Sequence, residues 1–151
     1  MQLHAEVEDA KKLMMEARDW SVMKWLREKK RVRKTADRAN EVFDELKEEI
    51  KARWSVDLKA AYQEVSKPSK MKQELQKIDP QVRLLAKRVK EAEDEAYRAR
   101  MDAEQTFDEA ERELSTSMAR EGCRKAIQQW ELDEKAIRLA ESAIASRNAT
   151  K

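Results

Sequence analysis

Apolar residues recur every three or four positions along two long stretches of this chain. In the first stretch the series covers residues 3–17 and 36–65, and in the second it covers residues 82–114 and 126–144. Side chains three and four positions apart lie on the same side of an α-helix, so this spacing predicts one apolar stripe on each of two helices. The predicted fold class is therefore all-α.

Both prolines of the chain, Pro68 and Pro80, lie between these two stretches. Proline lacks an amide donor and clashes with the preceding helical turn, so it ends helices. Asp79 and Pro80 also form a helix start, with a carboxylate at the cap and proline at the first helical position. The 151 residues suit a single domain. We predict a first arm over 2–66, a tip over 67–79 that holds a small helix from Ser69 to Lys77, and a second arm over 80–147.

The apolar period changes at one place in each arm, near residues 17–36 and near residues 110–129. If the arms pack antiparallel so that residue i faces roughly residue 146 − i, these two places lie at the same level. Two helices that share one apolar stripe should change period together. We therefore predict a long antiparallel helical hairpin, a two-helix coiled coil, in which Gly122 faces the large side chain of Trp25.

A compact four-helix bundle is the alternative architecture. It requires one turn near Thr35 and another near residues 115–117 or Gly122. The second turn is plausible because serine and threonine cap helices. The first is disfavoured because residues 27–34 contain no turn-forming residue, so the hairpin is the preferred prediction and the bundle stays open.

The composition limits the functions that this chain can have. Charged residues make up 42% and aromatic residues 5%, and there is one glycine. A two-helix hairpin of this kind buries little, so its stability should depend on association as well as on its own interior. The net charge of +2 gives the whole chain no strong electrostatic preference, and any such preference must be local.

Residue sets that carry chemistry are missing. His4 is the single histidine and has no partner motif, and no glycine-rich loop or Glu-x-x-His motif occurs. Cys123 has cations nearby in sequence that would lower its pKa, although a small half-buried side chain is the simpler interpretation. We expect no catalytic residue, metal, cofactor or small-molecule substrate, and therefore no enzyme. A lone cysteine, with neither a secretory signal nor an apolar run of roughly 20 residues, predicts a cytoplasmic protein.

The end of the hairpin that holds both termini has more apolar residues than one stripe needs. Residues 13–26 are apolar around most of the helix, and residues 132–143 add a second stripe to the other arm. Because a helix with two apolar faces requires two neighbours, we predict a scaffold or assembly element that forms a homodimer or binds another helical protein. The alternative is that the helices bend or break here and bury the excess internally. The predicted partner-binding residues are Met15, Trp20, Val22, Leu26, Leu132 and Leu139.

A second feature is the basic stretch 27–34, which has six cations in eight residues. Such a cluster can bind phosphates, so the alternative function is an anionic-surface binder for nucleic acid or acidic membrane. Carboxylates at 108–113 and 121 of the facing arm can instead pair with these cations within the chain. The candidate anion-binding residues are Lys29, Lys30, Arg31 and Arg33.

Overall fold

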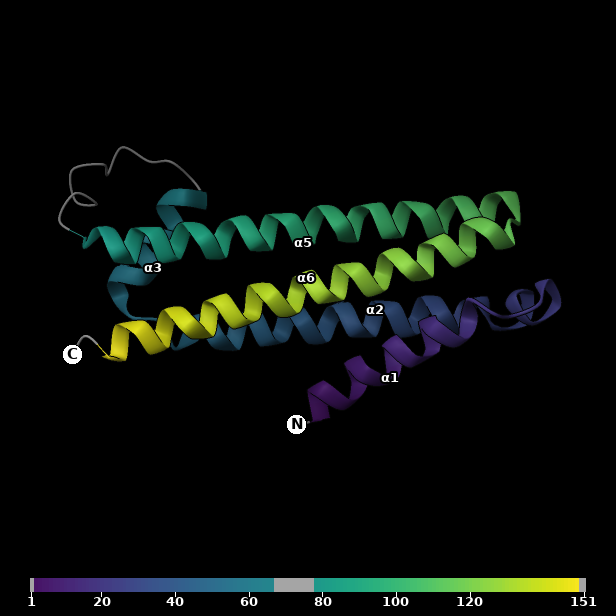
Figure 1. Cartoon of the computed structure of the whole chain (residues 1–151), viewed down its shortest axis with the longest axis horizontal. Coiled ribbons are helices and arrows are strands. Elements are labelled where there is room, and N and C mark those ends of the chain that lie inside the picture. Colours follow the sequence, from purple (N-terminus) through teal and green to yellow (C-terminus); the bar gives the residue numbers. More distant parts are fainter. Residues whose placement is uncertain (1, 67–77, 150–151) are drawn as a thin grey trace. The chain divides into compact units, whose positions relative to one another are not determined.

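The computed structural model describes residues 2–66 and 78–149, and it describes side chains within 5–66 and 78–147. The described residues confirm an all-α fold and contain no strand. The predicted tip helix from Ser69 to Lys77 lies outside them. The helices are α1 Gln2–Ala17, α2 Val22–Ala52, α3 Val56–Ser66, α5 Pro80–Glu113 and α6 Thr116–Ala149 (Figure 1).

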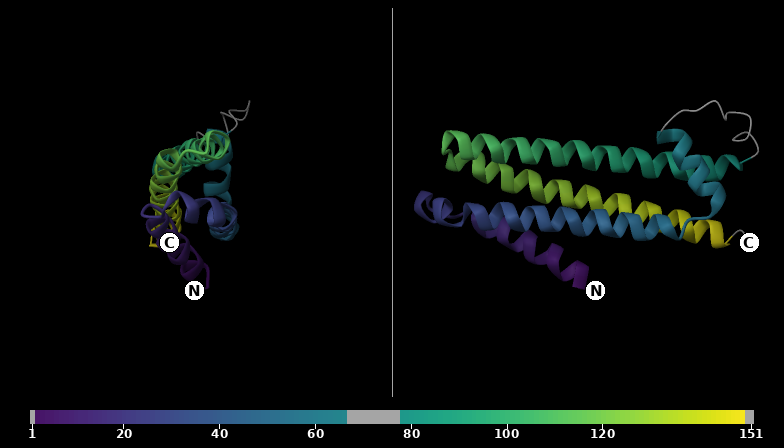
Figure 2. Two further views of the ribbon diagram at one scale, coloured as in Figure 1. Left: turned by 90° about the vertical axis from the view of Figure 1, so that its right-hand side faces the viewer. Right: turned by 180° about the vertical axis from the view of Figure 1, so that it is seen from behind.

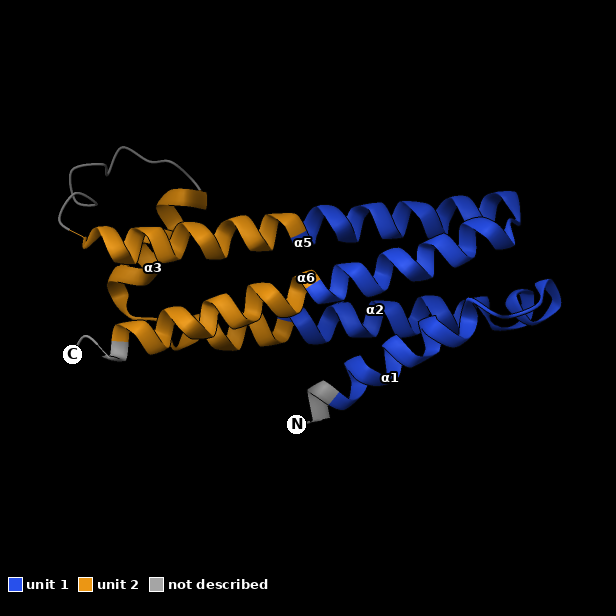
Figure 3. Ribbon diagram, in the orientation of Figure 1, with its two compact units in different colours: residues 1–44, 96–131 blue, residues 45–95, 132–151 orange. Residues whose placement is uncertain are grey.

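The chain divides into two compact units, which Figure 3 colours separately. Unit 1 comprises residues 1–44 and 96–131, and unit 2 comprises residues 45–95 and 132–151. Each unit contains residues of both predicted arms. The helices α2, α5 and α6 contribute residues to both units.

The prediction that each arm is one uninterrupted helix is wrong. The first arm consists of α1, α2 and α3, and the second consists of α5 and α6. Serine caps explain two of the new helix starts, because the amide of Lys24 donates to Ser21 Oγ and the amide of Met118 donates to Ser115 Oγ, each at 3.2 Å. The changes in apolar period near residues 17–36 and 110–129 thus coincide with the corners between α1 and α2 and between α5 and α6.

The corner between α5 and α6 also has a regular helix end. Leu114 adopts a φ of 51°, and the amide of Ser115 donates to the carbonyl of Ala110 at 3.0 Å. A left-handed residue followed by this bond is the Schellman motif that closes many helices. The turn that the bundle alternative expects near residues 115–117 is therefore present, but the turn near Thr35 is absent because α2 passes through that residue.

Two further helix starts depend on side-chain caps. At the start of α3, Asp57 accepts hydrogen bonds from the Ser55 hydroxyl and from the amide of Leu58. At the start of α5, the amide of Gln81 donates to Asp79 Oδ1 at 2.8 Å, which confirms the predicted cap before Pro80.

Within unit 1, α2 lies antiparallel to α5. Arg33 pairs with Asp108 and Glu111, while Asp44, further along α2, pairs with Arg100, earlier in α5. The predicted register places residue 33 opposite a position near 113 and residue 44 opposite one near 102, so the observed partners lie two to five residues away.

Helix α6 also packs in unit 1, against both α5 and α2. Lys125 pairs with Asp102 at 3.0 Å, and Gln129 donates to Asn40 Oδ1 at 2.7 Å; Figure 2 shows α5 and α6 side by side. A Cβ on Gly122 would lie 2.9 Å from the Phe107 ring. The predicted pairing of Gly122 with a large side chain is therefore correct in kind, but the partner is Phe107 of α5 and not Trp25, and Gly122 does not interrupt α6.

Unit 2 has its own core, which is formed by the end of α2, by α3, and by parts of α5 and α6. Lys51 near the end of α2 pairs with Glu93 of α5 at 3.0 Å, and Arg147 of α6 pairs with Asp57 of α3. The buried apolar residues of α2, the α2–α3 corner, α3 and α5 here are Ile50, Trp54, Leu58, Ala61, Val82, Ala86, Val89 and Ala92.

A membrane-spanning helix requires a long apolar stretch. None of the helices in the part of the chain that the structure describes contains one.

Candidate interaction surface

The α1–α2 corner of unit 1 carries exposed apolar side chains. Met15 at the end of α1 is 59% exposed, and in the first turns of α2 Val22, Met23 and Leu26 are 51%, 69% and 39% exposed. We call these four residues the corner surface. Met15, Val22 and Leu26 are predicted partner-binding residues. Met23 lies within the apolar run 13–26 but does not belong to that predicted set.

Trp20 does not belong to this surface. It is 7% exposed and lies in the core of unit 1. Its carbonyl accepts a hydrogen bond from Arg120 at 3.3 Å, and the Lys24 ammonium lies 5.1 Å from the centre of its ring. The chain leaves the helix between Ala17 and Ser21, and the break allows this tryptophan to be buried internally.

The second predicted stripe, on α6 in unit 2, is largely covered. Ala136 and Ala143 are buried, and Leu132 and Leu139 are half-buried. Much of the apolar excess that the sequence shows is therefore packed inside the chain, as the alternative of internal burial expects. The apolar side chains of residues 13–26 that remain exposed are those of the corner surface.

Four cations of the basic stretch lie on one exposed side of α2. Arg27, Lys30, Arg31 and Lys34 are all exposed, and their spacing of three, one and three residues places them in a single row. We call them the cationic stripe. Among the described residues, Glu28 pairs with Arg31 at 3.5 Å, and no carboxylate partner is recorded for the other three.

The remaining two cations of the basic stretch have different environments. Arg33 is part-buried, pairs with Asp108 at 3.0 Å and Glu111 at 3.3 Å, and lies 5.5 Å from the centre of the Phe107 ring. Lys29 is half-buried. Of the four predicted anion-binding residues, Lys30 and Arg31 are therefore in the exposed row, whereas Arg33 pairs internally.

Arg27 and Lys34 complete the row, but they were not singled out from the sequence. The signal in the sequence is their spacing: Arg27, Lys30, Arg31 and Lys34 occupy positions i, i+3, i+4 and i+7, on the side of the helix opposite the apolar stripe. That side can be identified because Trp25, Val32 and Ala36 are buried.

Cys123 of α6 is not a reactive thiol. Its side chain is fully buried, and burial raises its pKa to about 12 even though Arg18 opposes the shift. The expectation that neighbouring cations lower this pKa is wrong, and the interpretation of a small side chain that packs in the chain holds except that the side chain is fully buried and not half-buried. The thiolate, which is the nucleophilic form, is scarce at neutral pH.

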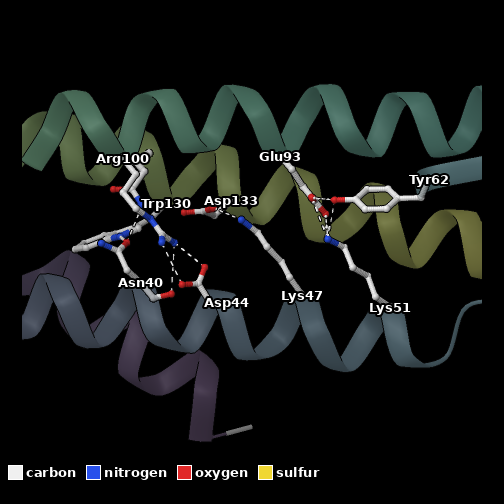
Figure 4. A network of polar contacts seen from close by, with 10 residues as sticks. Asn40, Asp44, Lys47, Lys51, Tyr62, Glu93, Arg100, Trp130 and Asp133 are labelled. Carbon is white, nitrogen blue, oxygen red and sulfur yellow. Dashed lines mark hydrogen bonds and ion pairs between the residues drawn. The ribbon is translucent and has the colours of Figure 1, made fainter. Parts of the chain in front are cut away.

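Buried polar contacts in unit 1 and part-buried ones in unit 2 are drawn in Figure 4. In unit 1, Asn40 Oδ1 accepts hydrogen bonds from Gln129 and from the Trp130 indole, at 2.7 and 3.0 Å. These three side chains are buried, and the bonds satisfy polar groups that would otherwise be costly to bury.

In unit 2 the corresponding contacts are charged. Lys51 donates to Tyr62 at 2.8 Å and to Glu93 at 3.0 Å, and the Tyr62 hydroxyl donates to Glu93 at 2.5 Å. Burial raises the pKa of Tyr62, and Glu93 raises it further. Tyr62 therefore stays a neutral donor at ordinary pH, which suits a structural role.

Neither cluster contains the residues of a metal site. The described residues include no group of three or more histidine, cysteine, aspartate or glutamate side chains placed to hold a metal ion.

Searches of protein-family models, of curated proteins and of solved structures find nothing that matches this chain.

Proposed function

We propose that this protein is a non-enzymatic interaction protein, a helical scaffold or assembly element that binds itself or a partner helix through the corner surface. One observation carries the proposal: Val22, Met23 and Leu26 in the first turns of α2, and Met15 at the end of α1, are all exposed on the two sides of one chain corner. Scattered apolar side chains are normal on a protein surface, whereas a group of them indicates a contact. Methionine suits such contacts because its side chain is flexible and polarisable.

The energy of this contact is modest. Fully burying one side chain of this size contributes about 1.5–3 kcal/mol, and these four are already partly covered. A two-fold homodimer doubles the buried set and is the simplest closed assembly, but association costs at least about 4 kcal/mol. We therefore expect a weak, reversible homodimer or an equally weak contact with a partner helix.

The architecture proposed for the scaffold is a helical bundle within each unit. The contacts that α2 makes with both α5 and α6 in unit 1 support such a bundle over a two-helix coiled coil, but it differs from the four-helix bundle with a turn near Thr35, because α2 passes through that residue. A cytoplasmic location is part of the proposal, and the buried free thiol of Cys123 is compatible with it.

Light scattering at 1–100 micromolar protein, a range of about two decades around the expected weak affinity, tests the proposal. The triple variant Val22→Ser/Met23→Ser/Leu26→Ser should stay monomeric at concentrations at which the unchanged protein is dimeric. The matched control replaces three exposed apolar residues of unit 2, as Val56→Ser/Val65→Ser/Leu84→Ser, and should dimerise like the unchanged protein. If the unchanged chain is monomeric at tens of micromolar and binds no helical partner, the proposal is wrong.

The second candidate function is anionic-surface binding. It is favoured by the cationic stripe, in which four exposed cations share one side of α2, and in the part of the chain that the structure describes Arg31 alone of the four pairs with a carboxylate. Contacts of this kind weaken steeply with added salt. The variant Arg27→Gln/Lys30→Gln/Arg31→Gln/Lys34→Gln should abolish binding to acidic vesicles or nucleic acid at low salt, and absence of any binding by the unchanged chain would exclude this function.

A further inference from the structure

We propose that the cationic stripe and the exposed apolar residues Met23 and Leu26 form one docking surface for bilayers that contain anionic lipids. The inference rests on the anionic-surface binding proposed above and specifies the partner. Cations contact the lipid headgroups, and the two apolar side chains enter the boundary between headgroups and acyl chains.

The geometry of α2 places both kinds of residue on a single surface. At 100° per residue, Met23 lies in line with Arg27, Lys30 and Lys34, and Leu26 borders the same row. All five are exposed. The row from Met23 to Lys34 spans about 16 Å at 1.5 Å per residue, which is enough to contact several headgroups. Further along this side, Asp37 and Glu41 end the row of cations.

The charge of the surface is net positive. Glu28 is the single carboxylate within residues 22–34, and it pairs with Arg31. Arg27, Lys30 and Lys34 are left to attract an anionic surface, with Lys24 one turn before them. Electrostatic attraction by a few cations gives weak binding by itself, and insertion of apolar side chains supplies the second contribution that stable membrane attachment requires.

The same residues fit nucleic acid less well. Single-strand binders stack bases on exposed aromatic side chains, but the two tryptophans near the stripe, Trp20 and Trp25, are both buried. Exposed Met23 and Leu26 would gain nothing from a phosphate backbone. A bilayer is the partner that uses both the cations and the apolar pair.

Cosedimentation of the full chain with lipid vesicles tests the inference. We expect binding to vesicles with about one third phosphatidylserine and much weaker binding to phosphatidylcholine alone. The variant with all four stripe cations changed to glutamine should bind at least about a hundredfold more weakly, since each cation near an anionic surface contributes about fivefold. The variant Met23→Ser/Leu26→Ser should bind about tenfold more weakly.

Two control variants carry the same chemical changes elsewhere. Arg83→Gln/Arg88→Gln/Lys135→Gln/Arg138→Gln removes four exposed cations of unit 2, and Val56→Ser/Leu84→Ser removes two exposed apolar residues there. Both should bind vesicles within about threefold of the unchanged chain. Circular dichroism of each variant establishes that a loss of binding is not a loss of fold.

The outcomes separate this inference from the function on which it rests. Binding to short duplex DNA or single-stranded RNA without binding to anionic vesicles would overturn the membrane inference and leave anionic-surface binding standing. Vesicle binding that Met23→Ser/Leu26→Ser does not weaken would overturn it too, because the apolar pair would then have no part. No binding to vesicles or to nucleic acid at low salt would overturn both.

Discussion

Lysines and arginines lie at both ends of α2, at higher density near its start, and the two sets have different environments. Near the end of the helix, in unit 2, the side chains of Lys47 and Lys51 are 15% and 22% exposed and pair with Asp133 and Glu93. In the first half, in unit 1, the four cations of the stripe are exposed, and within the described ranges Arg31 is the one that pairs with a carboxylate, that of Glu28. The first set connects helices within unit 2, and the second set is available to bind another surface.

The difference follows from the side of the helix that each residue occupies. Cations beside the buried apolar row meet carboxylates of neighbouring helices, as Lys47 does in unit 2 and Arg33 does in unit 1. Cations opposite that row meet solvent. Substitutions at the first kind of position should therefore lower the free energy of unfolding, and substitutions at the second kind should leave it nearly unchanged.

The largest expected effect is at Lys47. Its ammonium lies 2.6 Å from Asp133, whose carboxylate is 1% exposed. Lys47→Ala leaves this buried carboxylate without its ammonium partner, and we expect the free energy of unfolding to fall by about 3 kcal/mol. Urea denaturation followed by tryptophan fluorescence measures the change. The double variant Lys47→Met/Asp133→Leu removes both charges and should be more stable than Lys47→Ala, whereas a fall below about 1 kcal/mol for Lys47→Ala would show that the pair matters little.

In unit 1 we expect a smaller effect, which comes from packing and not from charge. A Cβ on Gly122 would lie 2.9 Å from the Phe107 ring, so Gly122→Ala forces α5 and α6 apart. Overpacking of this kind costs about 1–3 kcal/mol, and the better helix propensity of alanine returns about 1 kcal/mol. Thermal unfolding should show a lower Tm for Gly122→Ala. Adding Phe107→Leu should recover part of the loss, and a Tm above that of the unchanged chain would contradict the close packing.

Acid should weaken unit 2 through Asp57. Burial alone would raise the pKa of Asp57, but its bonds with Ser55, Arg147 and the amide of Leu58 outweigh burial and lower the pKa. A lowered pKa stabilises the fold above the ordinary pKa near 3.8, and this contribution is lost as the pH falls through the folded value. Asp57→Asn should therefore be less stable than the unchanged chain at pH 6. The two should converge toward pH 2, and a constant difference would contradict the assignment.

The smallest expected effect is at the cationic stripe. The variant with all four stripe cations changed to glutamine should unfold within about 0.5 kcal/mol of the unchanged chain, because exposed substitutions away from packed groups have little effect. The same denaturation experiment measures it. A loss of about 2 kcal/mol or more would place these cations among the structural ones and remove the contrast between the two ends of α2.

The all-α class, the start of α5 at Asp79 and an antiparallel neighbour for α2 can all be predicted from the sequence. The corners at residues 18–21 and 114–115 fall where the sequence allows a break only as an alternative, and the corner at residues 53–55 could not be predicted, because these corners contain neither proline nor glycine. They are closed by serine and aspartate caps and, at Leu114, by a leucine with positive φ. Such caps are common within helical sequences and become decisive only when tertiary packing favours a corner.

The sequence predicts the region of the candidate surface but not which of its side chains are exposed. Residues 13–34 show both the apolar excess and the cations, and five of the eight residues predicted there for partner or anion binding are exposed. Trp20 and Arg33 could not be separated from their exposed neighbours, because the Ser21 cap and the carboxylates of α5 decide which side chains are covered. The spacing of apolar residues shows which side of a helix is buried only when the residues at which the helix begins and ends are known.

The most direct test asks whether the start of α2 contacts a membrane. A polarity-sensitive fluorophore attached at Met23→Cys reports the environment of that position, and the buried Cys123, with its raised pKa, should not react in the folded chain. We predict that anionic vesicles shift the emission to shorter wavelength, that added salt reverses the shift, and that the same label at Val56→Cys, an exposed position in unit 2, shows no shift. Equal shifts at both positions, or no shift at position 23 while the protein sediments with the vesicles, would contradict the proposed binding surface.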